Sequence, residues 1–299
     1  MKTSKFKTAD GAQWLVNWHQ KVMDACQLDY ESINTQTSYG TTHVWAKNHQ
    51  EKNKPALLFL PGFRTCGIFW DLNNTLTPFY QDYRIYLVDV IGQPSLSAGK
   101  TPPVKGEGYG QWLVEVLDEL GLDQVLVSGA SFGGQLMVKL ALAAPERVKA
   151  MVGFNPVGVQ FISMGLRSMW YNLVTMIAPS PKNVQLYLDK MVLDPAFKLE
   201  KVPQQLLLEY QTYVVPNFKF GCDYPYKYSD AELSAVQVPA YFILCEHDRL
   251  IHQEKTAQRA KKVLPQFKSA TFLSHIGHGI ELAPQAFKVL KEIAQKEFQ

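Results

Sequence analysis

The feature that most constrains this 299-residue sequence is a serine in a glycine-rich turn. Gly129-Ala130-Ser131-Phe132-Gly133 fits the pattern G-x-S-x-G; the apolar run 125–127 precedes it and a helix-like segment, 132–144, follows. A serine on so sharp a strand-to-helix turn has strained backbone geometry, needs small neighbours and projects its hydroxyl above the sheet. The pattern therefore predicts a nucleophilic Ser131. The alternative is an ordinary glycine-rich turn in which the serine only caps the helix.

A serine hydroxyl needs a histidine base, and the histidine needs a carboxylate that orients it. Asp248 follows a predicted strand at 241–245, and His278, within Gly277-His278-Gly279, follows a predicted strand that ends near Leu273. Open α/β sheets place ligands at the carboxyl ends of their strands. Ser131, Asp248 and His278 are therefore the predicted catalytic residues. His275, which lacks flanking glycines, and Glu246 remain alternatives for the base and the acid.

The remaining sequence predicts an α/β fold with a doubly wound, mostly parallel sheet. Strand, turn, helix and strand follow one another around Ser131, which indicates βαβ units. Strands are predicted at 42–46, 56–60, 84–88, 125–127, 148–154, 240–244 and 270–273, and helices at 10–26, 111–120, 132–144, 254–264 and 284–298.

Between the fifth and sixth of these strands the pattern becomes helical, with helices predicted at 158–177, 183–192 and 203–214. We expect three parts: an N-terminal helical extension, 1–28; a core formed by 29–155 and 236–299; and a helical cap, 156–235. Aromatic and methionine residues are frequent in the cap, where most would form its own core and some would contact substrate. Examples are Phe161, Met164, Met169, Trp170, Met176, Tyr187, Tyr210, Phe220 and Tyr228.

Over residues 40–297 the chain resembles capped, carboxylesterase-like serine hydrolases of the α/β-hydrolase fold. The resemblance rests on Leu60-Pro61-Gly62-Phe63, Asp89 to Gly92 with Ser95, the turn at Ser131, Asp248, and Gly277-His278-Gly279. It implies an oxyanion hole formed by the backbone N–H groups of Phe63 and Phe132. Pro61-Gly62 stands where the family commonly has His-Gly. This difference does not affect the oxyanion hole that the resemblance implies, because the family uses a backbone N–H there. Some relatives carry the acid at the position of Asn155, but an amide supplies no charge, which favours Asp248.

The resemblance implies hydrolysis of carboxylic esters with a small or medium apolar acyl group, through an acyl-enzyme and without a cofactor. A non-catalytic ligand-binding or signalling homologue is an alternative, as are an acyltransferase, a peptidase or a C–C bond hydrolase on the same triad, because fold does not fix function. Arg64, beside the expected oxyanion residue, would bind a substrate carboxylate or serve in a structural ion pair.

Composition argues against several other classes. The 30 basic and 27 acidic residues leave a net charge of +3, too small for a nucleic-acid surface. Four cysteines without a CxxC pair indicate reduced thiols. The N-terminal residues contain no apolar signal segment, which favours a cytoplasmic location. The most apolar stretch, 164–177, is too short to span a membrane. We expect a small-molecule substrate and leave the oligomeric state open.

No cofactor or metal is predicted. Gly99-Lys100-Thr101 lacks the earlier glycine of a P-loop, and Gly106, Gly108 and Gly110 have no preceding strand, so we interpret them as a loop. His247 and His252 have no accompanying metal-binding motif. Cys66 is expected to be a buried, inert thiol.

Overall fold

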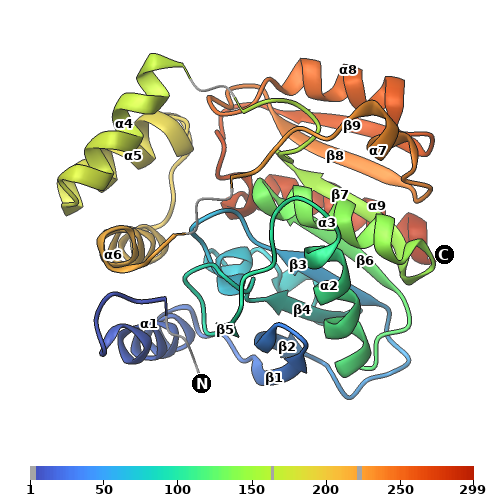
Figure 1. Cartoon of the computed structure of the whole chain (residues 1–299), viewed down its shortest axis with the longest axis horizontal. Helices are drawn as coiled ribbons and strands as arrows, with labels where there is room; N and C mark the ends of the chain where they lie inside the picture. Colours follow the sequence, from blue (N-terminus) through green and yellow to red (C-terminus); the bar gives the residue numbers. More distant parts are fainter. Residues whose placement is uncertain (1–4, 163–164, 221–223) are drawn as a thin grey trace.

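A single nine-stranded sheet organises the chain (Figure 1). The computed structural model describes residues 5–162, 165–220 and 224–299. The strand order is β1-β2-β4-β3-β6-β7-β8-β9, with the short β5 paired to β2. The strands are β1 (Glu31–Thr37), β2 (Gly40–Lys47), β3 (Ala56–Leu60), β4 (Arg84–Val88), β5 (Ala98–Gly99), β6 (Val125–Ala130), β7 (Val148–Phe154), β8 (Ala240–Cys245) and β9 (Phe267–Leu273).

Strands β4, β3, β6, β7, β8 and β9 run parallel, and β2 pairs antiparallel with β1, β4 and β5. The central strands β3, β6 and β8 are buried along their whole length, as their continuous apolar sequences predict. The predicted mostly parallel α/β sheet is therefore confirmed. The polar edge strand β1 was not predicted.

Helices cover both faces of the sheet. Side chains of α2 (Gly108–Glu119), α3 (Phe132–Ala143) and α8 (Gln253–Val263) share one hydrophobic cluster, whereas α1 (Gly11–Cys26) and α9 (Pro284–Phe298) contribute to a second one. Alternate residues of β3 belong to the two clusters, Leu58 to one and Phe59 to the other. The sheet is thus doubly wound.

A group of helices lies between β7 and β8, to one side of the sheet (Figure 1). We call α4 (Leu166–Ile177), α5 (Pro181–Tyr187), the π-helix Leu188–Val192 and α6 (Lys201–Asn217) the helical insertion. The expected helix at 158–177 begins only at Leu166. The short helix α7 (Asp230–Ser234) follows and begins with a capping box between Ser229 and Glu232.

The N-terminal helix α1 packs against the insertion. Trp14 stacks on Tyr213 with ring centroids 3.7 Å apart, and Trp18 Nε1 donates to the Leu206 carbonyl at 3.3 Å. The helix is thus docked on the chain's own α6 through its aromatic side chains.

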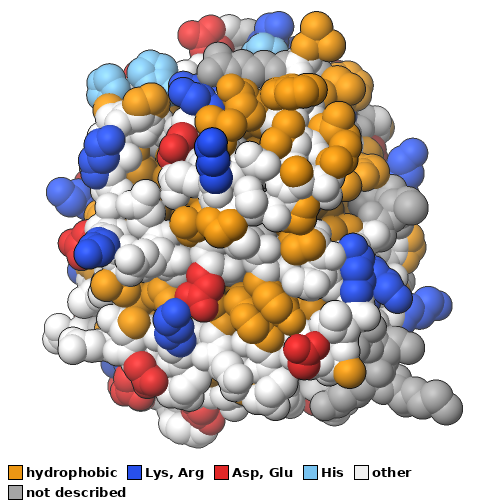
Figure 2. Space-filling view, turned by 90° about the vertical axis from the view of Figure 1, so that its left-hand side faces the viewer, with side chains coloured by type: hydrophobic (Ala, Val, Ile, Leu, Met, Phe, Trp, Pro, Cys, Tyr) orange, Lys and Arg blue, Asp and Glu red, His pale blue; other side chains and the backbone are white. Residues whose placement is uncertain are grey.

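The outer face of α4 is apolar and exposed. Figure 2 shows hydrophobic side chains gathered over the upper part of the face that the insertion forms. In α4 they come from Leu166, Met169, Trp170, Leu173, Met176 and Ile177. Among residues 5–162, 165–220 and 224–299, no helix is both long and apolar enough to cross a membrane.

Candidate active site

Ser131 lies on the turn between β6 and α3 with φ 48° and ψ −112°. The glycines two residues before and two residues after it have no room for a side chain. A Cβ at Gly129 would lie 2.3 Å from the Gly133 carbonyl oxygen, and a Cβ at Gly133 would lie 1.9 Å from the Leu60 carbonyl oxygen. The turn is fixed by backbone hydrogen bonds, including Ser131 N–H to the Phe154 carbonyl at 3.0 Å. The two glycines thus permit the strained conformation at Ser131.

Ser131, His278 and Asp248 form a hydrogen-bonded chain. His278 Nε2 lies 2.9 Å from Ser131 Oγ, and His278 Nδ1 lies 2.7 Å from Asp248 Oδ2. Asp248 Oδ1 accepts hydrogen bonds from the N–H groups of Leu250 and Ile251, at 2.7 and 3.0 Å. The structure therefore brings together the three residues that the sequence selects, from the loops after β6, β8 and β9.

The buried carboxylate of Asp248 controls the protonation of His278. Burial by itself lowers the pKa of His278, but the charge and hydrogen bond of Asp248, together with the charge of Glu281, raise the pKa above its ordinary value. The Asp248 side chain has no exposed surface. Sequence reasoning missed Glu281, whose charge also favours the imidazolium and whose own pKa is raised by burial.

Asn155 supports the loop that carries His278. Its Nδ2 donates to the carbonyls of Gly277 and His278 at 3.1 and 3.3 Å, and its Oδ1 accepts the Cys245 N–H at 2.8 Å. The side chain is fully buried and joins the ends of β7 and β8 to the histidine loop. Asn155 thus has a positioning role that its residue type did not reveal.

The helical insertion also contacts the histidine loop. Gly277 and Leu193 form an isolated antiparallel bridge, and the Gly279 N–H donates to the Val192 carbonyl at 3.0 Å. Gly277 has φ +97°, and a Cβ there would lie 2.5 Å from the Val192 carbonyl oxygen. A glycine is therefore required at the point where the insertion and the histidine loop meet.

The segment that contains Phe63 lies beside Ser131. A Cβ at Gly62 would lie 3.6 Å from Ser131 Cβ, and the rings of Phe63 and Phe132 meet edge to face with centroids 6.0 Å apart. Phe132 is the first residue of α3, where the helix leaves backbone N–H groups without intrahelical partners. The two residues expected to form the oxyanion hole therefore lie on adjoining segments next to Ser131.

Buried polar groups hold this segment in position. Arg64 N–H donates to Gln93 Oε1 at 2.9 Å, and Gly67 N–H donates to Asp89 Oδ1 at 2.8 Å. Asp89 also pairs with His43 Nδ1 at 3.0 Å, and both side chains are buried. Hydrogen bonds with His43 and Gly67 keep the pKa of Asp89 below its ordinary value, although burial opposes this. The carboxylate is thus an anchor for the chain that follows β3.

Comparison with known proteins shows which fold and which enzymes this chain resembles. Residues 55–202 match the model of the alpha/beta hydrolase fold family. Carboxylesterase YbfK of Bacillus subtilis is 27% identical over 85% of this chain and 84% of its own, and a second B. subtilis carboxylesterase, nap, is 26% identical over 84% and 82%. The chain has the α/β-hydrolase fold, and its similarity to bacterial carboxylesterases supports a hydrolase.

Solved structures of two Bacillus subtilis esterases support the fold assignment. The crystal structure of YbfK superposes with a TM-score of 0.80 at 23% identity, over 96% of this hydrolase and 98% of that chain. The naproxen esterase of B. subtilis superposes with a TM-score of 0.81 at 23% identity, over 98% and 100%. The likeness extends over nearly the whole chain, including the N-terminal helix that lay outside the sequence resemblance.

Arg64 of the hydrolase has no acidic partner among the described residues. Its guanidinium carbon lies 5.5 Å and 5.0 Å from the ring centroids of Phe63 and Phe220, and its Nη2 lies 3.8 Å from Met176 Sδ. Its positive charge and the negative charge of Asp248 act in opposite directions on the pKa of Tyr187, which burial raises. The cation therefore lies beside the segment that contains Phe63, and the structural ion pair considered for it is absent from the described part of the chain.

His275 and Glu246, the alternatives for the base and the acid, do not take part in the hydrogen-bonded chain of Ser131, His278 and Asp248. His275 lies beside His247 with ring centroids 5.3 Å apart, and Glu246 is exposed.

The interpretation of the glycines at 106–110 as a loop was wrong for Gly108 and Gly110, which lie in the first turn of α2. A Cβ at Gly110 would lie 2.8 Å from the Lys139 carbonyl oxygen, so this glycine allows α2 and α3 to pack closely.

The thiol of Cys66 is fully buried and its pKa is well above the ordinary value because of that burial. The aromatic and methionine residues expected in the segment 156–235 differ in burial, and Tyr187 and Phe220 are partly buried. Tyr210 and Tyr228 are buried, whereas Phe161, Met169, Trp170 and Met176 are exposed. Met164 and Cys222 lie outside the described residues.

Proposed function

We propose that this hydrolase cleaves carboxylic esters through an acyl-enzyme on Ser131. The observation that carries the proposal is the continuous hydrogen-bonded chain from the buried Asp248 through His278 to Ser131 Oγ. The relatives described as carboxylesterases support ester hydrolysis as the reaction class.

In the proposed mechanism, Ser131 Oγ attacks the ester carbonyl carbon while His278 Nε2 accepts the hydroxyl proton. The resulting imidazolium is stabilised by Asp248, and the oxyanion accepts hydrogen bonds from the N–H groups of Phe63 and Phe132. Collapse of the tetrahedral intermediate breaks the bond to the alkoxide, which takes the proton from His278. Water, deprotonated by His278, then attacks the acyl-enzyme, and a second collapse releases the carboxylic acid and restores the Ser131 hydroxyl.

Residues 156–235 would act as the cap in this scheme, selecting small or medium apolar acyl groups. The direct contacts of Val192 and Leu193 with the histidine loop support this role, because they place the insertion at the edge of the reacting groups. Acyl transfer is the alternative on the same residues, and partition of the product toward an added alcohol instead of water would distinguish it.

Treatment with a fluorophosphonate tests the proposed nucleophile directly. We expect intact-mass analysis to show one adduct on the wild-type protein and none on Ser131→Ala or His278→Ala, together with turnover of p-nitrophenyl butyrate by the wild type only. A folded protein that neither forms the adduct nor turns over short-chain esters would contradict the proposal and favour a non-catalytic ligand-binding homologue.

Arg64 is predicted to bind the terminal carboxylate of those acyl chains that carry one, in addition to the apolar part of the chain that the cap would contact. Its guanidinium has no acidic partner in the described chain and lies beside the oxyanion segment. A charge-assisted hydrogen bond contributes about 1.5–3 kcal/mol, so Arg64→Met should reduce kcat/KM for the p-nitrophenyl monoester of glutaric acid about tenfold or more relative to p-nitrophenyl butyrate.

Arg64→Lys is the matched control because it keeps the charge and loses the planar guanidinium. It should retain part of the preference for the anionic ester. An unchanged ratio of the two kcat/KM values in Arg64→Met would remove Arg64 from substrate recognition.

A further inference from the structure

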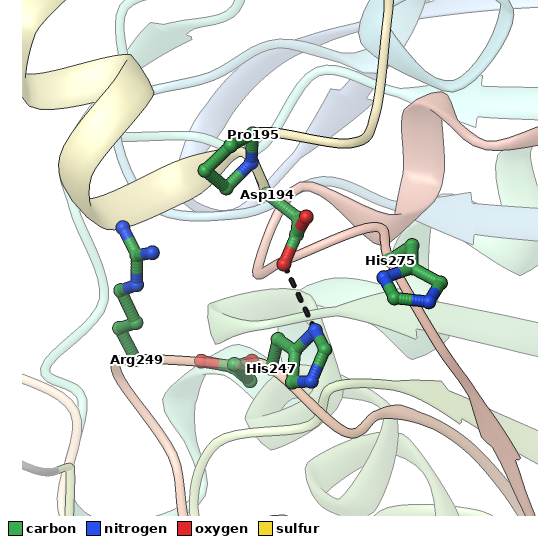
Figure 3. Close-up of a pocket in the computed structure, with 6 residues that line it drawn as sticks. Asp194, Pro195, His247, Arg249 and His275 are labelled. Atoms are coloured by element: carbon green, nitrogen blue, oxygen red, sulfur yellow. Dashed lines mark hydrogen bonds and ion pairs between the residues drawn. The ribbon is translucent and has the colours of Figure 1, made fainter.

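Three side chains with metal-binding atoms meet on the outer side of the catalytic loops. Asp194, His247 and His275 line an open pocket of about 510 Å³ together with Pro195, Asp248 and Arg249. Figure 3 shows the carboxylate of Asp194 directed at His247, with the imidazole of His275 beside them. The three candidate ligand atoms lie within 4.8 Å of one another.

We propose that Asp194, His247 and His275 form a binding site for Zn²⁺. Two imidazoles and one carboxylate are a ligand set that zinc accepts, with a water in the fourth tetrahedral position. Ligand atoms in such a site are about 3.3 Å apart when the bonds are about 2.0–2.1 Å. His247 Nδ1 already lies 2.9 Å from Asp194 Oδ2, so zinc would replace the proton that these two atoms share.

The carboxylate of Asp194 is positioned before any metal binds. Its Oδ1 accepts the Ala196 N–H at 2.8 Å, and its side chain is only 9% exposed. Partial burial raises its pKa, but the hydrogen bonds from Ala196 and His247 more than compensate and keep the pKa below its ordinary value. Carboxylates that bind metal ions are usually oriented by such a hydrogen bond from a neighbouring group.

The two imidazoles can complete the site with small side-chain movements. Both histidines are exposed, so their rings are accessible to a metal ion from solvent. The guanidinium of Arg249 does not occupy the place that the metal ion would take. Arg249 Nη1 donates to the Lys190 carbonyl at 2.6 Å, and its side chain extends toward the helical insertion (Figure 3).

The second cluster with suitable atoms, His19, Cys66 and Asp89, does not offer an equivalent site. All three residues are buried, and both Asp89 oxygens already accept hydrogen bonds, from Gly67 on one side and His43 on the other. Burial keeps Cys66 protonated, whereas zinc binds the thiolate. The exposed cluster is therefore the one that a metal ion can reach from solvent, and there only the hydrogen bond between the ligands Asp194 and His247 has to open.

The position of the site links the metal to the catalytic loops. Asp194 follows the π-helix of the insertion, His247 immediately precedes Asp248, and His275 precedes His278 by three residues. Zinc bound to all three would join the insertion to both loops. Because an ion that binds only the folded state stabilises it, zinc should raise the melting temperature.

Calorimetric titration of the metal-free full chain with Zn²⁺ tests the proposal. We expect one ion per chain for the wild type, and His247→Ala, His275→Ala and Asp194→Asn should each weaken binding about tenfold or more. His252→Ala is the matched control, since His252 is exposed in the same loop region but outside the cluster, and it should bind as the wild type does. Zinc should raise the melting temperature of the wild type and of His252→Ala, with little effect on the other three variants.

Substitution of Co²⁺ for zinc provides a spectroscopic check. A four-coordinate site of nitrogen and oxygen ligands should give visible d–d bands without the ultraviolet charge-transfer band of a cobalt thiolate. Failure of the wild type to bind, unchanged binding in His247→Ala and His275→Ala, or a thiolate band would each overturn the proposal. Circular dichroism of every variant would distinguish loss of the site from loss of the fold.

Discussion

Replacement of Ser131 by alanine is expected to lower kcat for p-nitrophenyl butyrate by about 10⁴- to 10⁶-fold without unfolding the protein. The substitution removes only Oγ, the atom 2.9 Å from His278 Nε2. The backbone bonds at this position remain, because the Ser131 N–H still donates to Phe154 and its carbonyl still accepts from Gly134 and Val157. Steady-state turnover and a thermal melt of the same preparation would measure the two effects separately.

Ser234→Ala is a suitable control for this prediction. Ser234 is an exposed serine at the end of α7, and its hydroxyl bonds only to the Ala231 carbonyl among the described residues. The control should keep wild-type turnover. If Ser131→Ala kept more than about 1% of the activity, the nucleophile would be elsewhere, since the rest of a triad site provides far less catalysis than that.

The sequence selects three residues that the structure brings together, because their placement follows from local rules. The glycines around Ser131 are required by approaches of 2.3 and 1.9 Å that any Cβ would violate, so the turn has a recognisable pattern. Asp248 and His278 follow strands that are apolar runs, and a parallel sheet brings strand ends together. Their proximity in space therefore follows from three short segments of sequence.

Elements that depend on tertiary contacts were harder to predict. Strand β1 has the polar sequence Glu31–Thr37 and is held by its pairing with β2, so no apolar alternation marks it. The helix expected from 158 begins at Leu166, and the segment expected to be helical at 183–192 ends as a π-helix. Local propensity did not determine these boundaries.

The contacts of Asn155 and the proximity of Asp194, His247 and His275 could not be read from the sequence either. Asn155 is informative only once the backbone of Gly277 and His278 is placed beside it, because its function lies in hydrogen bonds across 122 and 123 residues. Asp194 and His247 are likewise 53 residues apart and show no metal-binding spacing. Long-range contacts of this kind carry no local signature that spacing rules can detect.

The second large effect is expected for Asp248→Asn, which should lower kcat by about 10⁴-fold. Asparagine keeps an oxygen that can accept from Leu250 and Ile251, but it removes the negative charge 2.7 Å from His278 Nδ1. Without that charge, the imidazolium that forms during attack is no longer stabilised. The side chain is fully buried, so solvent cannot replace the lost interaction.

The pH dependence of kcat/KM provides a second test of the role of Asp248. The deprotonated imidazole is the base, so kcat/KM should fall as the pH falls through the pKa of His278. Because Asp248 raises that pKa, the wild-type inflection should lie above the ordinary histidine value of about 6.5, and in Asp248→Asn it should move to lower pH. Glu246→Gln is the matched control: it removes an exposed carboxylate two residues away and should change neither kcat nor the inflection. A loss of activity in Glu246→Gln as large as that in Asp248→Asn would contradict the assignment, because the charge that orients His278 would then come from the other acid.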